Sequence, residues 1–208
     1  MRVAVLVSGG GTNLQAILDA CERGDIKSAH VSCVVSNRSG AYALERAEKR
    51  GIKTALITKK QYGDNFEGEL VRHLNQQKTE LVVLAGFTAV LGHEFIKAFE
   101  NKIINVHPSL IPSFCGKGFY GLKVHEHALE YGVKVTGATV HFVSEVVDGG
   151  AVILQKAVDV HEDDTAETLQ KRVMEQAEWV ILPRAIELIA SGRVQILGRK
   201  TKVLGGRS

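Results

Sequence analysis

The first half of the sequence alternates short apolar runs with amphipathic segments of helical period, and this alternation restricts the fold more than any other feature. Apolar runs bounded by turn residues are typical of buried strands, and apolar residues at i, i+3, i+4 and i+7 are typical of helices. Strands are predicted at residues 2–7, 31–36, 53–58, 81–85 and 103–106, and helices at residues 12–23, 42–50, 65–77 and 93–100. This order predicts an α/β fold, a three-layer sandwich around a Rossmann-like, mostly parallel twisted sheet.

The second half has a different pattern. Residues 133–144 are rich in β-branched side chains, residues 151–160 form another strand-like run, and Val146–Gly150 between them is a turn signal. Two long strands with a short connection predict a C-terminal antiparallel hairpin. No repeat or linker interrupts the chain, so residues 1–208 are interpreted as a single domain.

A long helix is expected after the hairpin. Asp164 and Glu167 resemble a capping box at its start, and Pro183 is expected to kink it. The segment from Arg193 to Arg207 is the only charge-biased part of the chain, and it is interpreted as a solvated end.

Composition excludes several classes of protein. The formal net charge of +3 is too small to argue for a nucleic-acid partner, and the apolar N-terminal run is too short to cross a membrane. The three cysteines, Cys21, Cys33 and Cys115, have no disulfide or zinc spacing, which suits a reducing compartment. We therefore expect a cytoplasmic protein that binds neither nucleic acid nor membrane.

The run from Asn105 to Pro112 places an amide and an imidazole two residues apart at the end of an apolar strand. In an extended strand, residues i and i+2 point to the same face, so Asn105 and His107 are expected to project together. Pro108 removes a backbone donor and favours extended geometry at His107, so the strand is expected to stop there. Polar residues at the carboxyl edge of a parallel sheet are typical of a ligand site.

Asp148 lies in the turn of the predicted hairpin, followed by Gly149 and Gly150. Taken alone it is an ordinary turn aspartate, because Asp-Gly is a common turn pair. A long hairpin also brings its tip back over the strand edge that carries His107. A carboxylate beside that imidazole is expected to raise the histidine pKa.

The segment from Ser8 to Asn13 contains three consecutive glycines between the first strand and the first helix. Backbone N–H groups at a helix N-terminus bind anions, and glycines let a phosphate approach closely. A phosphate site is therefore favoured over a βα turn without a ligand. Leu14 stands where a dinucleotide fingerprint needs its third glycine, and no Gly-Lys-Ser/Thr of a P-loop follows.

Two further features leave alternatives open. The apolar segment from Ala85 to Leu91 is either core or the wall of a pocket for a flat aromatic ligand. His125, His127 and His141, even with Cys115, fit no ligand spacing, so no metal is expected. Cys115 has no neighbour in the sequence that would activate it as a nucleophile.

These motifs resemble those of the phosphoribosylglycinamide formyltransferases, folate-dependent enzymes of purine biosynthesis. The resemblance covers nearly the full length of the chain. It rests on Ser8–Gln15, Leu84–Phe87, Asn105–Pro112 and Asp148–Gly150.

The resemblance implies transfer of a formyl group from 10-formyltetrahydrofolate to the amine of 5'-phosphoribosylglycinamide. The products are 5'-phosphoribosyl-N-formylglycinamide and tetrahydrofolate, in de novo purine biosynthesis. The resemblance implies that the catalytic residues are Asn105, His107 and Asp148. It implies that the phosphorylated substrate is contacted by Gly11, Thr12, Asn13 and Glu178. It implies that the folate is contacted by Thr88, Ala89, Val90, Leu91 and Asn105. The N-terminal half then binds phosphate, and the C-terminal half contains the hairpin and binds folate. Partners are small molecules alone, and the protein is a monomer or a homodimer.

Two positions depart from the pattern of that family. Gly63 stands where an arginine near the folate is frequent, and Cys115 stands where proline is usual. The alternatives are another formyl-folate enzyme, with a different amine acceptor or with hydrolysis of the formyl folate, and a non-catalytic nucleotide-binding module. A non-catalytic module explains the glycines but gives no reason for Asn105, His107 and Asp148 together.

Overall fold

The protein is described from a computed structural model, in which the structure of residues 1–205 is described. The chain forms two compact units, Met1–Asn105 and Val106–Ser208. The strand order is β3-β2-β1-β4-β5-β6-β7, with β8 and β9 in a separate sheet. The predicted fold class, a mostly parallel sheet with flanking helices and a C-terminal antiparallel hairpin, is confirmed. The division into one functional domain stays a prediction.

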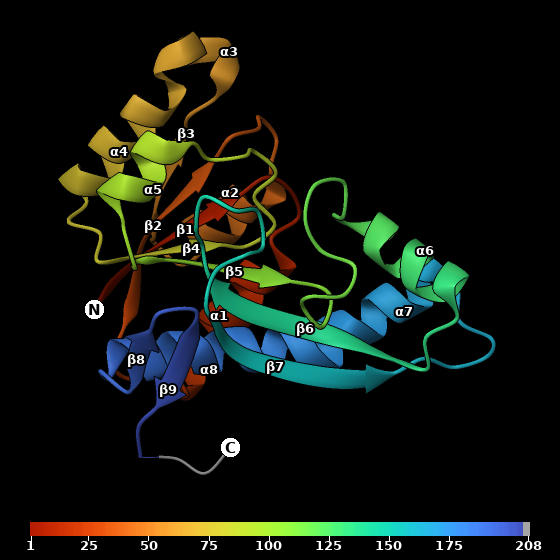
Figure 1. The fold of residues 1–208 in the computed structure, drawn as a ribbon. Helices are drawn as coiled ribbons and strands as arrows, with labels where there is room; N and C mark the ends of the chain where they lie inside the picture. The colour runs from red at the N-terminus through yellow and green to blue at the C-terminus, as the bar shows by residue number, and fades with distance from the viewer. Residues whose placement is uncertain (206–208) are drawn as a thin grey trace. The chain divides into compact units, whose positions relative to one another are not determined.

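The first unit alternates strands and helices along the chain (Figure 1). Its strands are β1 (Arg2–Val7), β2 (His30–Ser36), β3 (Lys53–Leu56), β4 (Leu81–Leu84) and the start of β5 (Ile103–His107). Its helices are α1 (Thr12–Arg23), α2 (Tyr42–Glu48), α3 (Lys59–Tyr62), the 3-10 turn η1 (Gly63–Asn65), α4 (Phe66–Gln76) and α5 (His93–Ala98).

All strand pairs of the first unit are parallel, and β1 lies between β2 and β4. Val3 to Val7 are fully buried, as expected for a parallel strand covered on both faces. Right-handed crossovers place α1 and α2 on one face of these strands and α4 and α5 on the other. Because the strand order reverses at β1, with β2 and β3 on one side and β4 and β5 on the other, the carboxyl ends of β1 and β4 form the switch point where open α/β sheets bind ligands.

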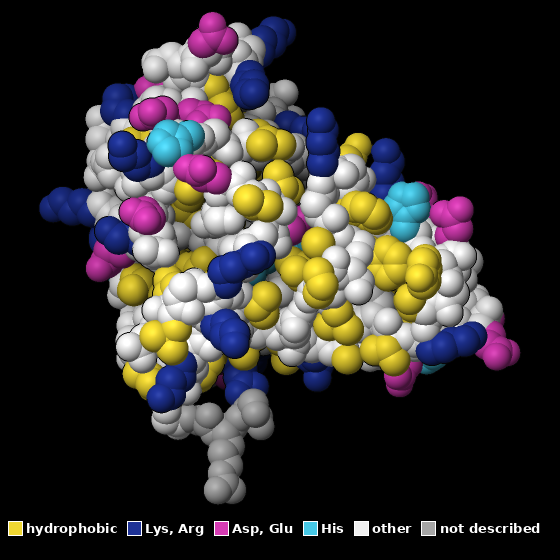
Figure 2. Space-filling view, in the orientation of Figure 1, with side chains coloured by type: hydrophobic (Ala, Val, Ile, Leu, Met, Phe, Trp, Pro, Cys, Tyr) yellow, Lys and Arg dark blue, Asp and Glu magenta, His cyan; other side chains and the backbone are white. Residues whose placement is uncertain are grey.

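The second unit is built on the antiparallel hairpin of β6 (Val135–Phe142) and β7 (Val152–Asp159). Its helical elements are α6 (Leu122–Tyr131), α7 (Ala166–Val173), the π-helical turn η2 (Met174–Glu178) and α8 (Trp179–Ala190). The small sheet of β8 (Val194–Leu197) and β9 (Lys200–Val203) follows. Hydrophobic side chains gather on the surface over α6 (Figure 2). Tyr131, the last residue of α6, and Tyr120, which precedes the helix, are both exposed.

The C-terminal part of the chain corrects three details. The capping box uses Thr165 and Thr168, while Asp164 forms an ion pair with Arg172, so the expected Asp164–Glu167 pair is wrong. The break from regular α-helix is η2, which lies before Pro183, and α8 continues through that proline. The described basic side chains of the segment are exposed, as expected of a solvated end, but the segment forms a β-hairpin that was not predicted, tied to β7 by the bond from the Thr201 hydroxyl to the Val152 carbonyl. Arg207 lies outside the described residues.

Candidate active site

β5 carries Asn105 and His107 two residues apart and ends at His107, as predicted from Pro108. Val106, between them, is buried, and so is His107 with 4% of its surface exposed. The strand therefore delivers an amide and an imidazole to the carboxyl edge of parallel strands, on the same side of the chain.

The two ring nitrogens of His107 face different groups. Nε2 lies 2.9 Å from the carbonyl oxygen of Phe114, and a carbonyl can only accept, so Nε2–H donates there. Nδ1 lies 3.7 Å from Oδ2 of Asp148. A neutral ring thus presents its lone pair to the carboxylate, and protonation at Nδ1 creates an ion pair.

Asp148 is fixed by both backbone and side-chain contacts. Its φ of 53° is in the left-handed region, which costs a non-glycine residue about 1–3 kcal/mol. The turn is closed by the bond from Gly149 N–H to the Val146 carbonyl, and Oδ2 accepts the Gly116 N–H at 2.8 Å. Gly150 is required because a Cβ there would lie 1.8 Å from the Phe142 carbonyl oxygen. The surrounding chain therefore holds the carboxylate against the imidazole.

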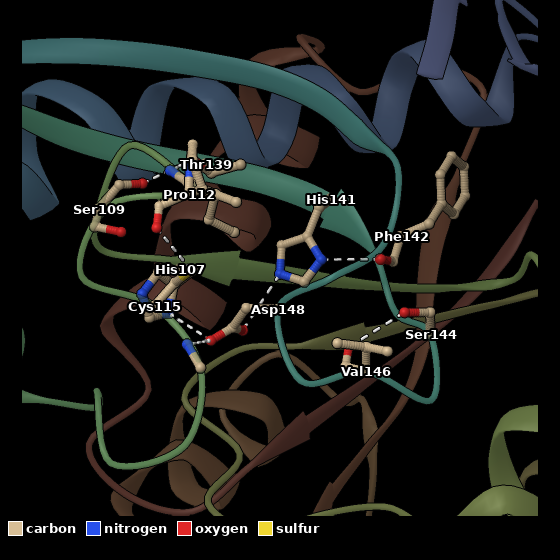
Figure 3. Close-up of polar contacts among 12 residues, drawn as sticks. His107, Ser109, Pro112, Cys115, Thr139, His141, Phe142, Ser144, Val146 and Asp148 are labelled. Atoms are coloured by element: carbon tan, nitrogen blue, oxygen red, sulfur yellow. Dashed lines mark hydrogen bonds and ion pairs between the residues drawn. The ribbon is translucent and has the colours of Figure 1, made fainter. Parts of the chain in front are cut away.

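His141 belongs to the same cluster, although the sequence pattern did not place it there. Its Nε2 lies 3.6 Å from Oδ1 of Asp148, and its Nδ1–H donates to the Phe142 carbonyl at 2.9 Å (Figure 3). The β6–β7 register shifts between Val140 and His141, and such irregularities re-aim side chains. The position of His141 at the end of the strand that leads into the Asp148 loop was the available signal.

Burial and charge act in opposite directions on this cluster. Burial lowers the pKa of His107, and the charge of Asp148 and the Phe114 carbonyl oppose it without reversing the shift. The expectation that Asp148 raises the His107 pKa above its ordinary value is therefore wrong, because desolvation is the larger effect. For Asp148, burial alone would raise the pKa, but His141, His107 and the Gly116 N–H outweigh it and lower the pKa.

The loop after β5 is anchored to the hairpin. The Thr139 hydroxyl donates to the Ser109 carbonyl at 2.7 Å and accepts the Ile111 N–H at 3.1 Å. The Gln155 amide donates to the Ile111 carbonyl at 2.9 Å, and the Ile111–Pro112 peptide bond is cis. The loop is therefore held by the hairpin residues that face it.

In the first unit, the glycine-rich segment leads directly into α1. Gly11 is the N-cap with φ 73°, no side chain caps the helix, and its first turn contains no acidic residue. A Cβ on Gly11 would lie 2.6 Å from the Cβ of Ala43, so a side chain cannot fit. Thr12 and Asn13 occupy the first turn. A helix start of this kind has the positive backbone end that an anion needs.

Arg46 on α2 supports the glycine-rich segment. Its Nε donates to the Gly10 carbonyl and its Nη1 to Oε1 of Gln15, each at 2.8 Å. The guanidinium also lies over the ring of Tyr42, 4.8 Å from the centroid. Arg46 thus fixes the shape of the segment and brings a positive charge beside it.

The segment Thr88–Leu91 is both pocket wall and core. Thr88, Ala89 and Val90 line a pocket, whereas Leu91 is buried in the core. That the pocket takes a flat aromatic ligand stays a prediction. The Ser8 hydroxyl accepts the Thr88 N–H at 2.8 Å, and a carboxylate oxygen of Glu67 accepts the Gly92 N–H at 2.9 Å. Both ends of the segment are therefore anchored.

Other expected site residues lie as follows. Glu178 is buried at the end of the π-helical turn η2, and such turns are frequent at functional sites. Gly63 has φ 53° and ψ −128°, a conformation open to glycine, which explains the absence of arginine there. Cys115 donates its thiol to the Pro112 carbonyl, and burial raises the pKa of that thiol, which does not favour a nucleophile.

No group of three or more histidine, cysteine or carboxylate side chains among residues 1–205 is arranged to hold a metal ion. His125, on α6, is fully buried, and neither of its ring nitrogens has a hydrogen-bond partner within the described chain. Burial, with a smaller contribution from the charge of His107, lowers its pKa to about 4. It is therefore a neutral core imidazole at neutral pH.

The fold is α/β, and Asn105 and His107 lie at the carboxyl end of a parallel strand, the edge where proteins with open α/β sheets bind ligands. Residues 1–186 match the formyl transferase family, so the chain belongs to that family and the resemblance seen in the sequence is confirmed.

Similar proteins support this assignment. The chain is 47% identical over 198 residues to the trifunctional purine biosynthetic protein adenosine-3 of Gallus gallus. This match covers 94% of this chain and 19% of that protein. It thus spans about a fifth of the length of these trifunctional relatives. It is 41% identical to a phosphoribosylglycinamide formyltransferase of Haemophilus influenzae, over 94% of this chain and 90% of the relative. A glycinamide ribonucleotide transformylase 1 from Symbiobacterium toebii matches with a TM-score of 0.92 and 44% identity, over 98% of this chain and 94% of that structure.

Within the described residues, no helix has the length and apolar character needed to span a bilayer.

Proposed function

We propose that the protein transfers the formyl group of 10-formyltetrahydrofolate to the amine of 5'-phosphoribosylglycinamide, a step of de novo purine biosynthesis. The observation that carries the proposal is the buried contact between Asp148 and His107. His107 lies on β5, the strand that also presents Asn105. The match to the formyl transferase family and to relatives of that name supports it. No metal and no covalent enzyme intermediate are required, because the formyl donor is already activated.

The chemistry begins with attack of the amine on the formyl carbon. A carbon–nitrogen bond to the acceptor forms, the bond to N10 of the folate breaks, and the proton lost by the amine ends on N10. The Asn105 amide donates to the oxyanion that develops; one such donor is typically worth about a hundred- to a thousand-fold in rate.

His107 and Asp148 act as an acid–base pair. Because burial lowers the His107 pKa, the resting imidazole is ready to accept a proton. Nδ1 faces Asp148, so the imidazolium formed there is stabilised by the carboxylate. The pair then returns the proton to the leaving nitrogen, a role typically worth about a hundred- to ten-thousand-fold in rate.

Substrate binding is divided among three segments. The phosphate of the ribonucleotide binds at Gly11, Thr12 and Asn13, supported by the uncapped start of α1. Glu178 contacts the same substrate. The folate binds against Thr88, Ala89, Val90 and Leu91 and reaches Asn105. The partners are these small molecules alone, and the protein acts in the cytoplasm as a monomer or a homodimer.

The test is a formyl-transfer assay on the purified protein, with 5'-phosphoribosylglycinamide and a 10-formyl folate. The loss of the formyl group from the folate is measured in three reactions: with the acceptor present, with it omitted, and with it replaced by another primary amine. We expect release of the folate product only with the phosphoribosyl acceptor. Equal loss without acceptor would establish a hydrolase, and binding without turnover would establish a nucleotide-binding module; either result contradicts the proposal.

A further inference from the structure

The hairpin carries a pair of polar side chains that faces the loop after β5. Thr139 on β6 and Gln155 on β7 are directly opposite each other in the strand register, so their side chains lie on the same face. Thr139 is fully buried, whereas Gln155 is exposed. The Gln155 amide donates to the Thr139 hydroxyl at 3.0 Å, so the two side chains support each other.

This pair binds the backbone at the start of the loop. The Thr139 hydroxyl donates its single hydrogen to the Ser109 carbonyl (Figure 3) and accepts the Ile111 N–H. The Gln155 amide also donates to the Ile111 carbonyl. A hydroxyl has one donor and two acceptor positions, and all three are occupied at Thr139. Valine at this position would remove every one of these bonds at nearly unchanged volume.

β6 also lets the loop approach closely. A Cβ on Gly137 would lie 2.9 Å from Cδ2 of Leu110 and 2.0 Å from the Lys156 carbonyl oxygen, so only glycine fits there. Leu110 thus packs against the backbone of the strand that carries Thr139. The hydrogen bonds and this contact together fix the position of the loop on the hairpin.

A short turn joins this fixed part of the loop to the active site. The Ser113 N–H donates to the Leu110 carbonyl at 3.0 Å, and the Ser109 hydroxyl donates to the Ser113 carbonyl at 2.6 Å. The next residue, Phe114, has φ 47°, a left-handed conformation that persists only where the surroundings fix it. Its carbonyl accepts Nε2–H of His107 at 2.9 Å. A shift of the fixed residues would therefore move the Phe114 carbonyl relative to His107.

The Phe114 carbonyl determines which ring nitrogen of a neutral His107 carries the proton. Two acceptors compete for it, the Phe114 carbonyl beside Nε2 and the Asp148 carboxylate 3.7 Å from Nδ1. A carboxylate is the stronger acceptor, but 3.7 Å is beyond hydrogen-bond distance. While the carbonyl stays in place, the proton resides on Nε2 and the Nδ1 lone pair faces Asp148. Release of the carbonyl would let the ring turn towards Asp148 and carry its proton on Nδ1.

We propose that Thr139 and Gln155 are positioning residues for the acid–base pair, because they hold the loop whose Phe114 carbonyl keeps His107 in its Nε2–H tautomer. Both act through the backbone of the loop rather than on the substrates. The tautomer is a property of the free protein. Its value for turnover rests on the proposed function, in which Nδ1 accepts a proton beside Asp148.

The variants are Thr139→Val, Gln155→Leu and the conservative Thr139→Ser, which retains the hydroxyl. Because Gln155 is exposed, Gln155→Leu removes the amide without disturbing the core, and it carries the test if Thr139→Val does not fold. Thr136→Val is the matched control. Thr136 is a buried threonine on the same strand, three residues away and therefore on the opposite face. Circular dichroism checks folding.

The first measurement is nitrogen NMR of isotope-labelled histidine side chains in the substrate-free protein, at a pH where His107 is neutral. A protonated and an unprotonated ring nitrogen have different chemical shifts, so the spectrum reports the tautomer. The chain contains eight histidines, and the His107 signals are assigned as those lost in His107→Ala. We expect the proton on Nε2 in the wild-type protein, Thr139→Ser and Thr136→Val. In Thr139→Val and Gln155→Leu we expect the Nδ1 signal to move towards its protonated position.

The second measurement is the steady-state kinetics of formyl transfer. We expect kcat to fall about tenfold in Thr139→Val and about threefold in Gln155→Leu, because the acid–base pair is misplaced while both substrates still bind. Michaelis constants stay within about twofold, as for a loss confined to the transition state. Thr139→Ser and Thr136→Val turn over like the wild-type protein. In an active enzyme, a changed tautomer at unchanged kcat would overturn the role in catalysis.

The tautomer separates this proposal from the proposed function. A changed tautomer in Thr139→Val and Gln155→Leu supports the positioning role even if the wild-type protein transfers no formyl group to the ribonucleotide. An unchanged Nε2–H tautomer in either folded variant removes that residue from the positioning role, even if kcat falls, because the loss is then structural alone. A wild-type ring protonated on Nδ1, or an equal change in Thr136→Val or Thr139→Ser, overturns the proposal as well.

Discussion

The cluster of His107, His141 and Asp148 and the glycine-rich segment before α1 are polar sites built in opposite ways. In the cluster, buried side chains face one another, and the pKa values of His107 and Asp148 depend on their neighbours and on desolvation. In the glycine-rich segment, the backbone forms the site, and neighbours such as Ala43 and Arg46 fix its path. The cluster is thus sensitive to charge and pH, and the segment is sensitive to backbone geometry.

The strongest test of the side-chain cluster is His107→Ala. We expect kcat to fall about a hundred- to ten-thousand-fold, because the acid–base group is lost. His127→Ala is the matched control, since His127 is an exposed histidine whose ring contacts are Glu130 and Phe119. Steady-state kinetics give the effect, and circular dichroism verifies the fold. Turnover close to wild type in a folded His107→Ala variant would remove this residue from the mechanism.

His125 tests whether burial is the dominant effect on the pKa of a histidine in the second unit. Its folded-state pKa of about 4 lies below the ordinary 6.5, so the unfolded chain binds its proton first as pH falls. Stability is therefore present above pH 6.5 and is lost as pH falls towards 4, by about 2–3 kcal/mol. His125→Leu should flatten the unfolding free energy over this range, measured by urea titration at several pH values. A slope identical to wild type would show that His125 does not titrate in this way.

Gly11→Ala tests the backbone-built site. The new Cβ would meet Ala43 at 2.6 Å in a left-handed conformation, so we expect a loss of about 2 kcal/mol in the free energy of unfolding. Gly10→Ala is the control, because a Cβ there meets nothing within 4 Å. Thermal and urea unfolding measure both variants. Equal stability of the two would mean that the path of the segment does not depend on glycine at residue 11.

Asp148→Asn separates charge from geometry, because asparagine also tolerates the left-handed φ of 53°. Without the carboxylate, burial acts alone and the His107 pKa falls further below 6.5. We expect kcat to fall about tenfold, with the pH limb that reports His107 moved towards acid. NMR titration of the imidazole and kcat against pH provide the measurements. An unmoved histidine pKa would leave Asp148 with a role in the turn alone.

The smallest effect is expected from a chelator. No ligand set is present among residues 1–205, so turnover in EDTA should equal turnover in buffer. Loss of activity that zinc restores would contradict this prediction and would require ligands supplied in some other way.

The sequence predicted what depends on local pattern. β1 and α1 were predicted to the residue, because a continuous apolar run and an i, i+3, i+4 pattern each specify one element. The contact of Asp148 with His107 was also predicted, since a hairpin fixes where its turn lies.

Features that depend on tertiary packing were not predicted. The direction of the His107 pKa shift depends on burial by residues distant in the sequence. His141 joins the site at a strand irregularity that no alternation pattern encodes. The positive φ of Gly63 and the β8–β9 hairpin were missed for a different reason, because the apolar pattern does not indicate local backbone geometry.

The Ser8 hydroxyl joins the loops that follow three strands of the first unit, since it donates to Asn37 and accepts from Thr88. Its single hydrogen and its lone pairs are all engaged, because the Thr88 hydroxyl donates to the same oxygen. A ligand that orders the loop after β1 therefore also restrains the loop after β4. Thermodynamic linkage requires the reverse as well. Under the proposed function the ribonucleotide phosphate binds the loop after β1 and the folate binds the loop after β4, so the two substrates are expected to bind cooperatively.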